Sequence, residues 1–205
     1  MNVVGSIAEA PAAPGAPAPA AEEHAADATR DWLEQRFRAV NEHGVYAAHQ
    51  PIYGFRTGPS ERGALRKYAI TLAIARALAR LDFRTLADVG GAEGYKAALV
   101  RHLFAADVTS CDLAAEACAR AREIYGIKTR QVDTHTLPFA DGEFDVVMAS
   151  ETLEHVPDLR GAAAELLRVA RRAVVITVPR EPQHKIDAVR RAGEPHGHLH
   201  ALTRS

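Results

Sequence analysis

A glycine-rich turn between an apolar run and an amphipathic helix constrains the fold more than any other feature of this 205-residue chain. The run Thr85–Val89 predicts a buried parallel strand. Gly90, Gly91 and Gly94 follow it, and Tyr95–Leu103 then carries apolar residues at helical spacing. Glycines allow a close approach of the backbone to a ligand, and a helix start offers unpaired N–H groups. The order strand, glycine turn, helix therefore predicts a cradle for a nucleotide-type ligand.

Short apolar runs alternate with amphipathic segments through the rest of the chain. The expected strands are Leu86–Gly90, Asp107–Cys111, Thr129–Val132, Phe144–Ala149 and Ala173–Val178. The expected helices are Tyr95–Leu103, Ala114–Tyr125 and Leu159–Arg171. This alternation predicts an α/β, Rossmann-like doubly wound fold, with a mainly parallel sheet and helices on both faces. We expect one domain over 27–205, with N-terminal helices in 27–82 and the Rossmann-like core in 83–205.

The chain before this core divides into a tail and two helices. Residues 1–26 are rich in Ala and Pro, and the repeated prolines predict a disordered tail. One helix is expected at Asp27–Asn41, and a second begins at Ser60. The loop over 43–55 is rich in aromatic residues, which fits either a lid over a substrate or local packing.

Charge and cysteine content bound the function classes. The net charge is −1, so no strong attraction to nucleic acid or to an anionic membrane is expected. Arg168, Arg171 and Arg172 are interpreted as the solvated end of a helix, where cations suit the helix dipole. Cys111 and Cys118 are too few for a disulfide framework. With no signal peptide and no long apolar run, we expect a cytoplasmic protein without a membrane span.

The glycine turn favours a ligand that carries no phosphates. In the G-x-G-x-x-G pattern of dinucleotide sites, Ala92 takes the place of the second glycine, and Glu93 would repel a pyrophosphate. Asp112 ends the second expected strand, 24 residues after Asp88, and a carboxylate there can accept both ribose hydroxyls. Alternatively, Asp112 caps the helix that follows it.

These residues resemble motif I of the class I S-adenosylmethionine (SAM) methyltransferases. Asp88, Gly90 and Gly94 match the usual Asp-x-Gly-x-Gly-x-Gly loop, and Ala92 departs from it. The resemblance extends over roughly 65–203 and is closest to the methyltransferase type 11 group, which includes ubiquinone-biosynthesis enzymes. That family usually adds two more strands, which are either missing here or beyond the end of this sequence.

The resemblance implies SAM as the cofactor. Asp88 and Glu93 would help to hold the methionine amino group, and Leu113 would cover the adenine. Asp133 would accept a hydrogen bond from the adenine amino group, and the Thr134 backbone would contact the ring. Leu137, Pro138 and Phe139 would shape the pocket. The expected cofactor-binding residues are Asp88, Gly90, Gly91, Glu93, Gly94, Asp112, Leu113, Asp133, Thr134 and Glu151.

An E-x-x-E-H sequence follows the fourth expected strand. Glu151, Glu154 and His155 would share one face of a helix, and two carboxylates with an imidazole suit a divalent cation such as Mg²⁺. By likeness to certain small-RNA 3′-end and ubiquinone O-methyltransferases, His198 would be the fourth metal ligand. Without a metal, His155 would act as a general base and, with Glu151, form the catalytic pair. Packing and hydrogen bonding are the remaining alternative for this segment.

The expected function is transfer of the SAM methyl group to an O, N or C nucleophile of a small molecule, by in-line displacement. A nicotinamide-dependent oxidoreductase is disfavoured by the interrupted glycine pattern and by the lack of a Tyr-x-x-x-Lys pair after the fourth strand. A non-catalytic or partner-dependent subunit is the other alternative. Nucleic acid is the least expected acceptor because the chain is nearly neutral, and the sequence predicts no particular oligomeric state.

Overall fold

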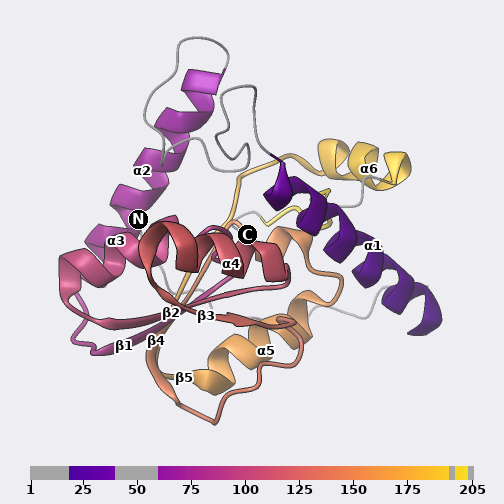
Figure 1. Cartoon of the computed structure of the whole chain (residues 1–205). Helices are drawn as coiled ribbons and strands as arrows, with labels where there is room; N and C mark the ends of the chain where they lie inside the picture. The colour runs from indigo at the N-terminus through magenta and orange to yellow at the C-terminus, as the bar shows by residue number, and fades with distance from the viewer. Residues whose placement is uncertain (1–18, 40–59, 194–196, 203–205) are drawn as a thin grey trace.

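The computed structural model describes residues 19–39, 60–193 and 197–202, and shows one parallel sheet flanked by helices (Figure 1). The strands are β1 (Thr85–Val89), β2 (Asp107–Asp112), β3 (Lys128–Gln131), β4 (Phe144–Ser150) and β5 (Ala170–Thr177). Their order in the sheet is β3-β2-β1-β4-β5, and all neighbours are parallel. The predicted Rossmann-like α/β fold is confirmed. Strand order reverses between β1 and β4, and a crevice at such a point is where ligands of these sheets bind.

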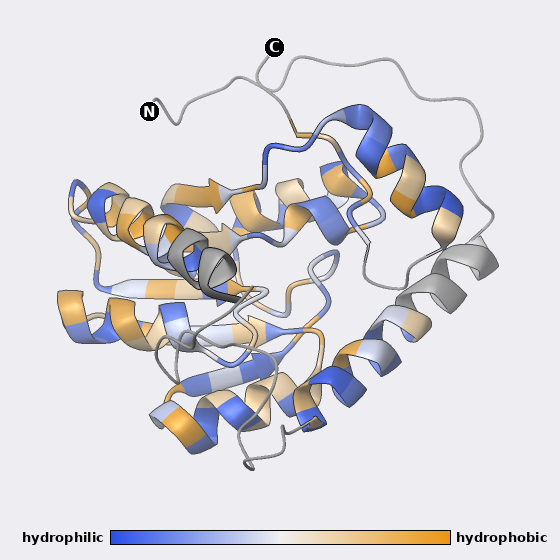
Figure 2. Ribbon diagram, turned by 90° about the horizontal axis from the view of Figure 1, so that it is seen from above, coloured by the Kyte–Doolittle hydropathy of each residue, from blue (hydrophilic) through white to orange (hydrophobic). Residues whose placement is uncertain are grey.

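Helices cover both faces of this sheet. The helices of the core are α2 (Ser60–Leu78), α3 (Tyr95–Phe104), α4 (Ala115–Tyr125) and α5 (Leu159–Val169). Apolar residues of α2, α3 and α4 pack on one face, and those of α5 pack on the other. Because both faces are covered, β4 is buried at every position. Figure 2 shows hydrophobic residues along the central strands and hydrophilic residues on the outer sides of the helices.

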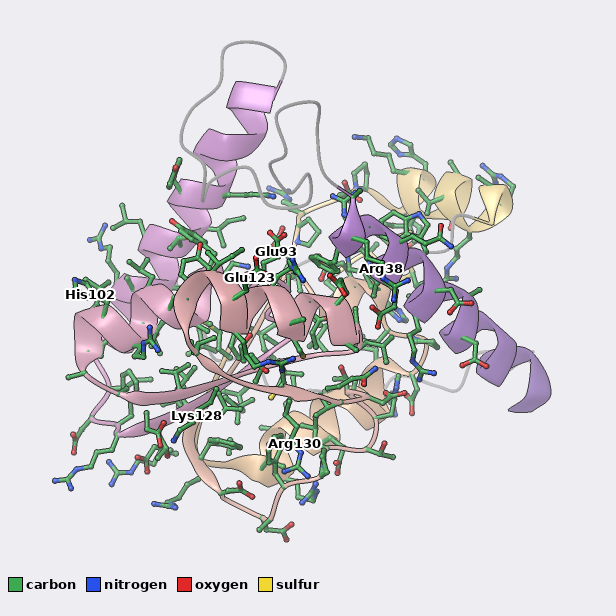
Figure 3. The ribbon with its side chains drawn as sticks, viewed as in Figure 1. Arg38, Glu93, His102, Glu123, Lys128 and Arg130 are labelled. Carbon is green, nitrogen blue, oxygen red and sulfur yellow. The ribbon has the colours of Figure 1, made fainter. Side chains whose placement is uncertain are left out.

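Edge strand β3 has a different composition from the central strands. Its residues are mostly exposed, and Lys128 and Arg130 extend from it (Figure 3). Lys128 pairs with Asp107 of β2 at 2.6 Å. Charged side chains on an edge strand discourage pairing with a second chain, so this edge is protected.

Two further helices lie outside the core layers. Helix α1 (Pro19–Arg38) packs across the start of α4, where Leu33 and Phe37 contact Ala114 and Ala117 (Figure 1). It begins eight residues before the predicted start, because a proline is tolerated in the first turn of a helix. The prediction of a disordered tail over 1–26 is therefore wrong for 19–26, which are helical. Residues 1–18 lie outside the described part. The aromatic loop 43–55 also lies outside it.

The junction between α5 and β5 corrects a prediction. Helix α5 ends at Val169, and β5 begins at Ala170 without a loop, whereas a helix was expected up to Arg171. Arg171 and Arg172 thus lie on a strand, where both contact the Asp145 carboxylate, at 3.2 and 3.6 Å. Pairing of Ala170 with Phe144 of β4 ends the helix early.

After β5 the described residues form helix α6 (Gln183–Ala192) and an extended segment, 197–202, without another strand. A 3₁₀ helix, η2 (Leu153–His155), follows β4. None of the helices within the described ranges combines the length and apolar character needed to cross a membrane. Cys111 and Cys118 are buried and unpaired.

Candidate active site

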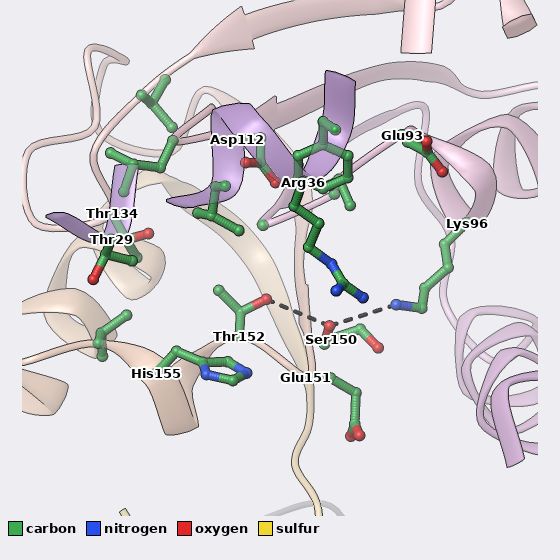
Figure 4. Close-up of a pocket in the computed structure, with 18 of the residues that line it drawn as sticks. Thr29, Arg36, Glu93, Lys96, Asp112, Thr134, Ser150, Glu151, Thr152 and His155 are labelled. Atoms are coloured by element: carbon green, nitrogen blue, oxygen red, sulfur yellow. Dashed lines mark hydrogen bonds between the residues drawn. The ribbon is translucent and has the colours of Figure 1, made fainter. Parts of the chain in front are cut away.

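A cavity of about 520 Å³ lies beyond the carboxyl ends of the central strands (Figure 4). Its floor comes from the turn after β1, from the ends of β2 and β4, and from the segment after β3. Helices α1 and α2 contribute the remaining wall through residues such as Trp32, Arg36 and Thr71. The cavity therefore occupies the position where the strand order of the sheet predicts a ligand.

The glycine turn is packed tightly against its neighbours. Gly90 has a φ of 76°, and a methyl group there would lie 2.3 Å from Thr152 Oγ1. A methyl group at Gly91 would lie 2.3 Å from Ser110 Oγ. Both glycine N–H groups donate to the Cys111 carbonyl, at 2.8 and 2.9 Å. Gly90 and Gly91 thus bring bare backbone to the cavity wall, as predicted for a ligand cradle.

Two predicted ligands of the turn do not reach the cavity wall. Gly94 begins α3 with a φ of 76°, and a methyl group there would lie 2.7 Å from Ala121 Cβ, so Gly94 serves the contact between α3 and α4. Asp88 is buried beneath the turn, where burial raises its pKa to about 6. Neither Gly94 nor Asp88 is therefore placed to contact a cofactor directly in this cavity. Glu93 is buried as well, but it lines the cavity.

Asp112 joins the glycine turn to the start of α4. Its Oδ2 accepts the Ala92 N–H at 2.8 Å, and its Oδ1 accepts the Ala114 N–H at 3.0 Å. Burial raises the pKa of Asp112, and these two backbone donors lower it in part. The N-cap position of α4 belongs to Ala114, so the alternative interpretation of Asp112 as the cap residue is wrong. A carboxylate has about four acceptor positions, which leaves capacity for two hydroxyl donors from the cavity.

The segment after β3 forms the adjacent wall. Asp133, Thr134 and His135 line the cavity next to Leu113. Asp133 Oδ1 accepts both the His135 backbone N–H, at 2.9 Å, and His135 Nδ1, at 2.7 Å. The hydrogen bond between the two side chains lowers the pKa of Asp133 and raises that of His135. Oδ2 of Asp133 is left to accept a donor from a ligand.

The predicted pocket-shaping residues 137–139 lie elsewhere. Leu137 and Phe139 are buried in the core under α5, and the cavity wall does not include them. Glu165 accepts the Leu137 N–H at 2.8 Å, and Arg168 donates to the carbonyls of Leu137 and Phe139. Arg168, expected at a solvated helix end, thus fixes the segment that follows the cavity wall.

The E-x-x-E-H residues separate into two groups. Glu151 has a φ of 57°, and η2 is a 3₁₀ helix, so Glu151 does not share a face with Glu154 and His155. Potential ligand atoms of Glu154, His155 and His198 lie within 4.8 Å of one another, without Glu151. The prediction of a four-residue metal site is therefore wrong in including Glu151. Glu151 and His155 line the cavity instead (Figure 4), and their role as a catalytic pair stays a prediction.

The C-terminal segment holds η2 in place. His198 Nδ1 is 2.7 Å from Glu181 Oε2, and the rings of His155 and His198 are in edge contact at 4.6 Å. His155 Nδ1 lies 3.3 Å from the Gly197 carbonyl, and its Nε2 lies 3.9 Å from Oε1 of the buried Glu154.

Sequence reasoning missed the contributions of the first two helices and of α3. Trp32, Arg36, Lys67, Thr71 and Lys96 all line the cavity. The apolar side of α1 predicted packing, but no spacing in the sequence indicates that α1 returns over an edge of the sheet about 80 residues away. Glu34 makes this contact, because its carboxylate accepts the N–H groups of Ala115 and Glu116 at 2.5 and 2.9 Å.

Comparison with known proteins agrees with this geometry. Residues 87–178 match a family described as a methyltransferase domain. Over these residues the chain is similar to methyltransferase domains, as the resemblance to the class I SAM-dependent methyltransferases predicts. An uncharacterised methyltransferase of Mycobacterium sp. strain KMS is 38% identical over 89 residues, which cover 43% of this chain and 35% of the relative. The chain thus matches about a third of the length of that methyltransferase.

Solved methyltransferase structures share the fold. A candidate methyltransferase from Bacillus halodurans C-125 superposes with a TM-score of 0.55 at 19% identity, over 65% of this chain and 63% of the other. Geranyl diphosphate C-methyltransferase from Streptomyces coelicolor A3(2), in complex with Mg²⁺, geranyl diphosphate and S-adenosylhomocysteine, superposes with a TM-score of 0.50 at 18% identity. That match covers 70% of this chain and 61% of the Streptomyces enzyme.

Proposed function

We propose that this protein transfers the methyl group of SAM to an O, N or C nucleophile of a small-molecule acceptor. The observation that carries the proposal is the arrangement of Gly90, Asp112 and Asp133 around one cavity, next to a turn that holds the acid Glu93. Carboxylates suit ribose hydroxyls, an adenine amino group and a cationic ligand, and they repel a phosphate. The Streptomyces enzyme with a similar fold is named as a complex with S-adenosylhomocysteine, which supports the same cofactor.

The cavity residues divide the work of the reaction. Asp112 accepts the ribose hydroxyls, Leu113 and Thr134 contact the adenine, and Asp133 accepts its amino group. Glu93 and the backbone of Gly90 and Gly91 hold the methionine end, with Asp88 acting from beneath the turn.

SAM, when bound, supplies an electrophilic methyl group. The protein contributes alignment of the acceptor nucleophile with that methyl group. His155 Nε2 takes the proton that an O or N nucleophile releases, and Glu151 orients the acceptor beside it. A divalent cation has no part in this proposal, because Glu154 and His198 are not among the residues that line the cavity.

Titration with S-adenosylhomocysteine tests the cofactor assignment. Trp32, the only tryptophan, lines the cavity and reports binding through its fluorescence. We expect saturable binding, and Asp112→Asn should weaken it about tenfold or more through lost charge-assisted hydrogen bonds. Asp107→Asn, at the exposed start of β2, is the matched control and should change affinity less than about threefold. A lack of binding at about 1 mM would refute the proposal.

The alternatives predict different titrations. A nicotinamide enzyme would bind NADH, which the buried Glu93 in the turn opposes. A non-catalytic or partner-dependent subunit would bind the cofactor without methylating any acceptor. Mass spectrometry of extract incubated with SAM and the protein, with Asp112→Asn as the negative control, separates this case from an enzyme. The proposed location is the cytoplasm, which the two unpaired cysteines favour.

A further inference from the structure

Two cationic side chains from distant parts of the sequence meet in the cavity. Arg36 of α1 and Lys96 of α3 both line it, and Figure 4 shows their charged ends pointing toward one another above Ser150. Lys96 Nζ lies 3.5 Å from the Ser150 carbonyl, and the Arg36 guanidinium lies 5.2 Å from the centre of the Trp32 ring. Arg36 is exposed and Lys96 is partly buried, so water weakens their repulsion, and an anion that binds both would be attracted by the two charges together.

No described carboxylate pairs closely with either cation, although the Lys96 charge acts on the buried Asp88 carboxylate and lowers its pKa in part. Glu93 and Glu151 also line the cavity, but among the described side chains no carboxylate oxygen lies within 4.0 Å of Arg36 or Lys96. The carboxylates assigned to the adenosine, Asp112 and Asp133, are engaged by backbone and histidine donors. The two cations therefore lack a close carboxylate partner among the described side chains, although Glu93 and Glu151 line the same cavity.

The cofactor alone does not balance these charges. SAM carries one carboxylate against an ammonium and a sulfonium group, so its net charge is positive. Its carboxylate can neutralise one of the two cations and leaves the other beside a cationic cofactor. A second anion, from the acceptor, removes this repulsion. An arginine fork can also bind a carboxylate through two parallel hydrogen bonds, and a lysine adds a point charge.

We propose that the methyl acceptor is an organic acid whose carboxylate binds Arg36 and Lys96, with its apolar body against Trp32. This inference rests on the proposed function, because it names the substrate class of the same cavity. The carboxylate fixes one end of the acceptor above Ser150, and the nucleophile then lies on the side of Glu151 and His155.

The test uses benzoate as the probe anion and benzamide as its neutral isostere. Each is titrated calorimetrically into the full chain saturated with S-adenosylhomocysteine. We expect benzoate to bind at least about tenfold more tightly than benzamide. Lys96→Gln and Arg36→Gln should each reduce benzoate affinity about five- to tenfold, and at most one of them should weaken S-adenosylhomocysteine by more than about threefold, because the cofactor carboxylate can pair with only one cation. Arg38→Gln, on the same helix but outside the cavity wall, should change neither affinity.

The outcomes separate the possible sources of the carboxylate. If both substitutions weaken S-adenosylhomocysteine as much as benzoate, and leave 5′-methylthioadenosine unaffected, the cations serve the carboxylate of the cofactor and the proposal is wrong. Equal binding of benzoate and benzamide, or no binding of either, also overturns it while the cofactor assignment stands. Failure of S-adenosylhomocysteine itself to bind the unmodified chain refutes the cofactor and this inference together. Retained S-adenosylhomocysteine binding shows that each variant is folded.

Discussion

At the residue scale, strained backbone gathers around the cavity. Ala92 has a φ of 51° in the glycine turn, and Glu151 has a φ of 57° at the end of β4. Non-glycine residues in the left-handed region cost about 1–2 kcal/mol. Both residues line the cavity, and the Ala92 N–H donates to Asp112. The strain therefore holds polar groups in the positions that the ligand requires.

Ala92→Gly should stabilise the protein. Glycine removes the energetic cost of the positive φ in the folded state. It also makes the unfolded chain more flexible, which lowers the free energy of unfolding by about 0.4–1 kcal/mol and offsets part of that gain. We expect the free energy of unfolding in urea to rise by up to about 1 kcal/mol. Ala105→Gly is the matched control, because Ala105 has the same φ of 51° at the end of α3, away from the cavity wall. A fall in stability for Ala92→Gly with a gain for Ala105→Gly would show that the turn depends on the Ala92 methyl group.

Asp88 should make stability depend on pH. Burial raises its pKa from 3.8 to about 6 in the folded protein. Between these values the folded state keeps a proton that the unfolded state has released, so stability falls as pH rises through this window. The total loss is at most about 3 kcal/mol. Asp88→Asn removes this loss, and the variant should gain stability relative to the unmodified protein on going from pH 4 to pH 8.

Urea unfolding at both pH values checks this prediction. Asp107→Asn is the control, because Asp107 is exposed on the same sheet and pairs only with Lys128 at the surface. The titration of Asp133 is common to all three proteins and cancels in the comparison, whereas the Asp112 charge raises the pKa of Asp88 and is part of the effect that the comparison measures. A stability difference between Asp88→Asn and the unmodified protein that is the same at pH 4 and pH 8 would mean that Asp88 is not the titrating group.

At the element scale, α1 supplies the side-chain cap that the N-terminus of α4 lacks. The N-cap position of α4 is Ala114, which makes no side-chain cap hydrogen bond. Glu34 of α1 accepts the first N–H groups of α4 instead, and its negative charge suits the positive end of the helix dipole. Because α4 starts directly after Asp112 and Leu113, one carboxylate holds α1 over the cavity and supports the cofactor-binding turn.

Glu34→Ala should loosen both elements. Loss of a helix cap costs about 0.5–2 kcal/mol, and the displaced α1 carries Trp32 away from the cavity. We expect a lower free energy of unfolding, a red shift of Trp32 emission and about three- to tenfold weaker binding of S-adenosylhomocysteine. Glu123→Ala, an exposed acid on α4 that pairs with Arg120, should have little effect on any of the three. Unchanged binding by Glu34→Ala would show that α1 does not contribute to the cofactor site.

The elements also show how far sequence could lead. Hydrophobic runs predicted all five strands and helices α3, α4 and α5, because the central strands are buried between helices and these helices each pack an apolar face on the sheet. The same patterns could not predict the position of α1, since the partners of Glu34 are about 80 residues distant. Helical spacing also misplaced Glu151, because its left-handed φ and the 3₁₀ helix after it depend on the packing of Thr152 against Gly90.

The sequence predicted those cavity residues that lie at or just after the ends of strands. Asp112, Leu113, Asp133 and Thr134 follow strand ends, and the topology of a parallel sheet brings such residues together. Arg36 and Lys96 were missed because only the folded chain places them in one cavity.

At the scale of the whole molecule, the cavity is lined by three parts of the chain. Helix α1 meets the core through α4, α2 reaches the cavity through Ile70 and Thr71, and the sheet contributes its carboxyl edge. Asp112 and Asp133, proposed for the adenosine, and Arg36 and Lys96, proposed for the acceptor, all line this one cavity. A ligand that spans the cavity would therefore contact all three parts, and its binding should be felt beyond the residues that it touches.

S-adenosylhomocysteine should stabilise the whole molecule and protect α1 from hydrogen exchange. At about 100 times its Kd, a ligand that binds only the folded state adds about 2.7 kcal/mol, which corresponds to a rise in Tm of roughly 5–10 °C for a protein of this size. Amides of α1 should exchange more slowly in the complex, because Thr29, Leu33 and Phe37 line the cavity, whereas α6 contributes no residue to it and should not change. Asp112→Asn at the same ligand concentration should lose most of both effects. A rise in Tm without protection of α1 would mean that the cofactor occupies the sheet edge alone, and that α1 closes only when the acceptor binds.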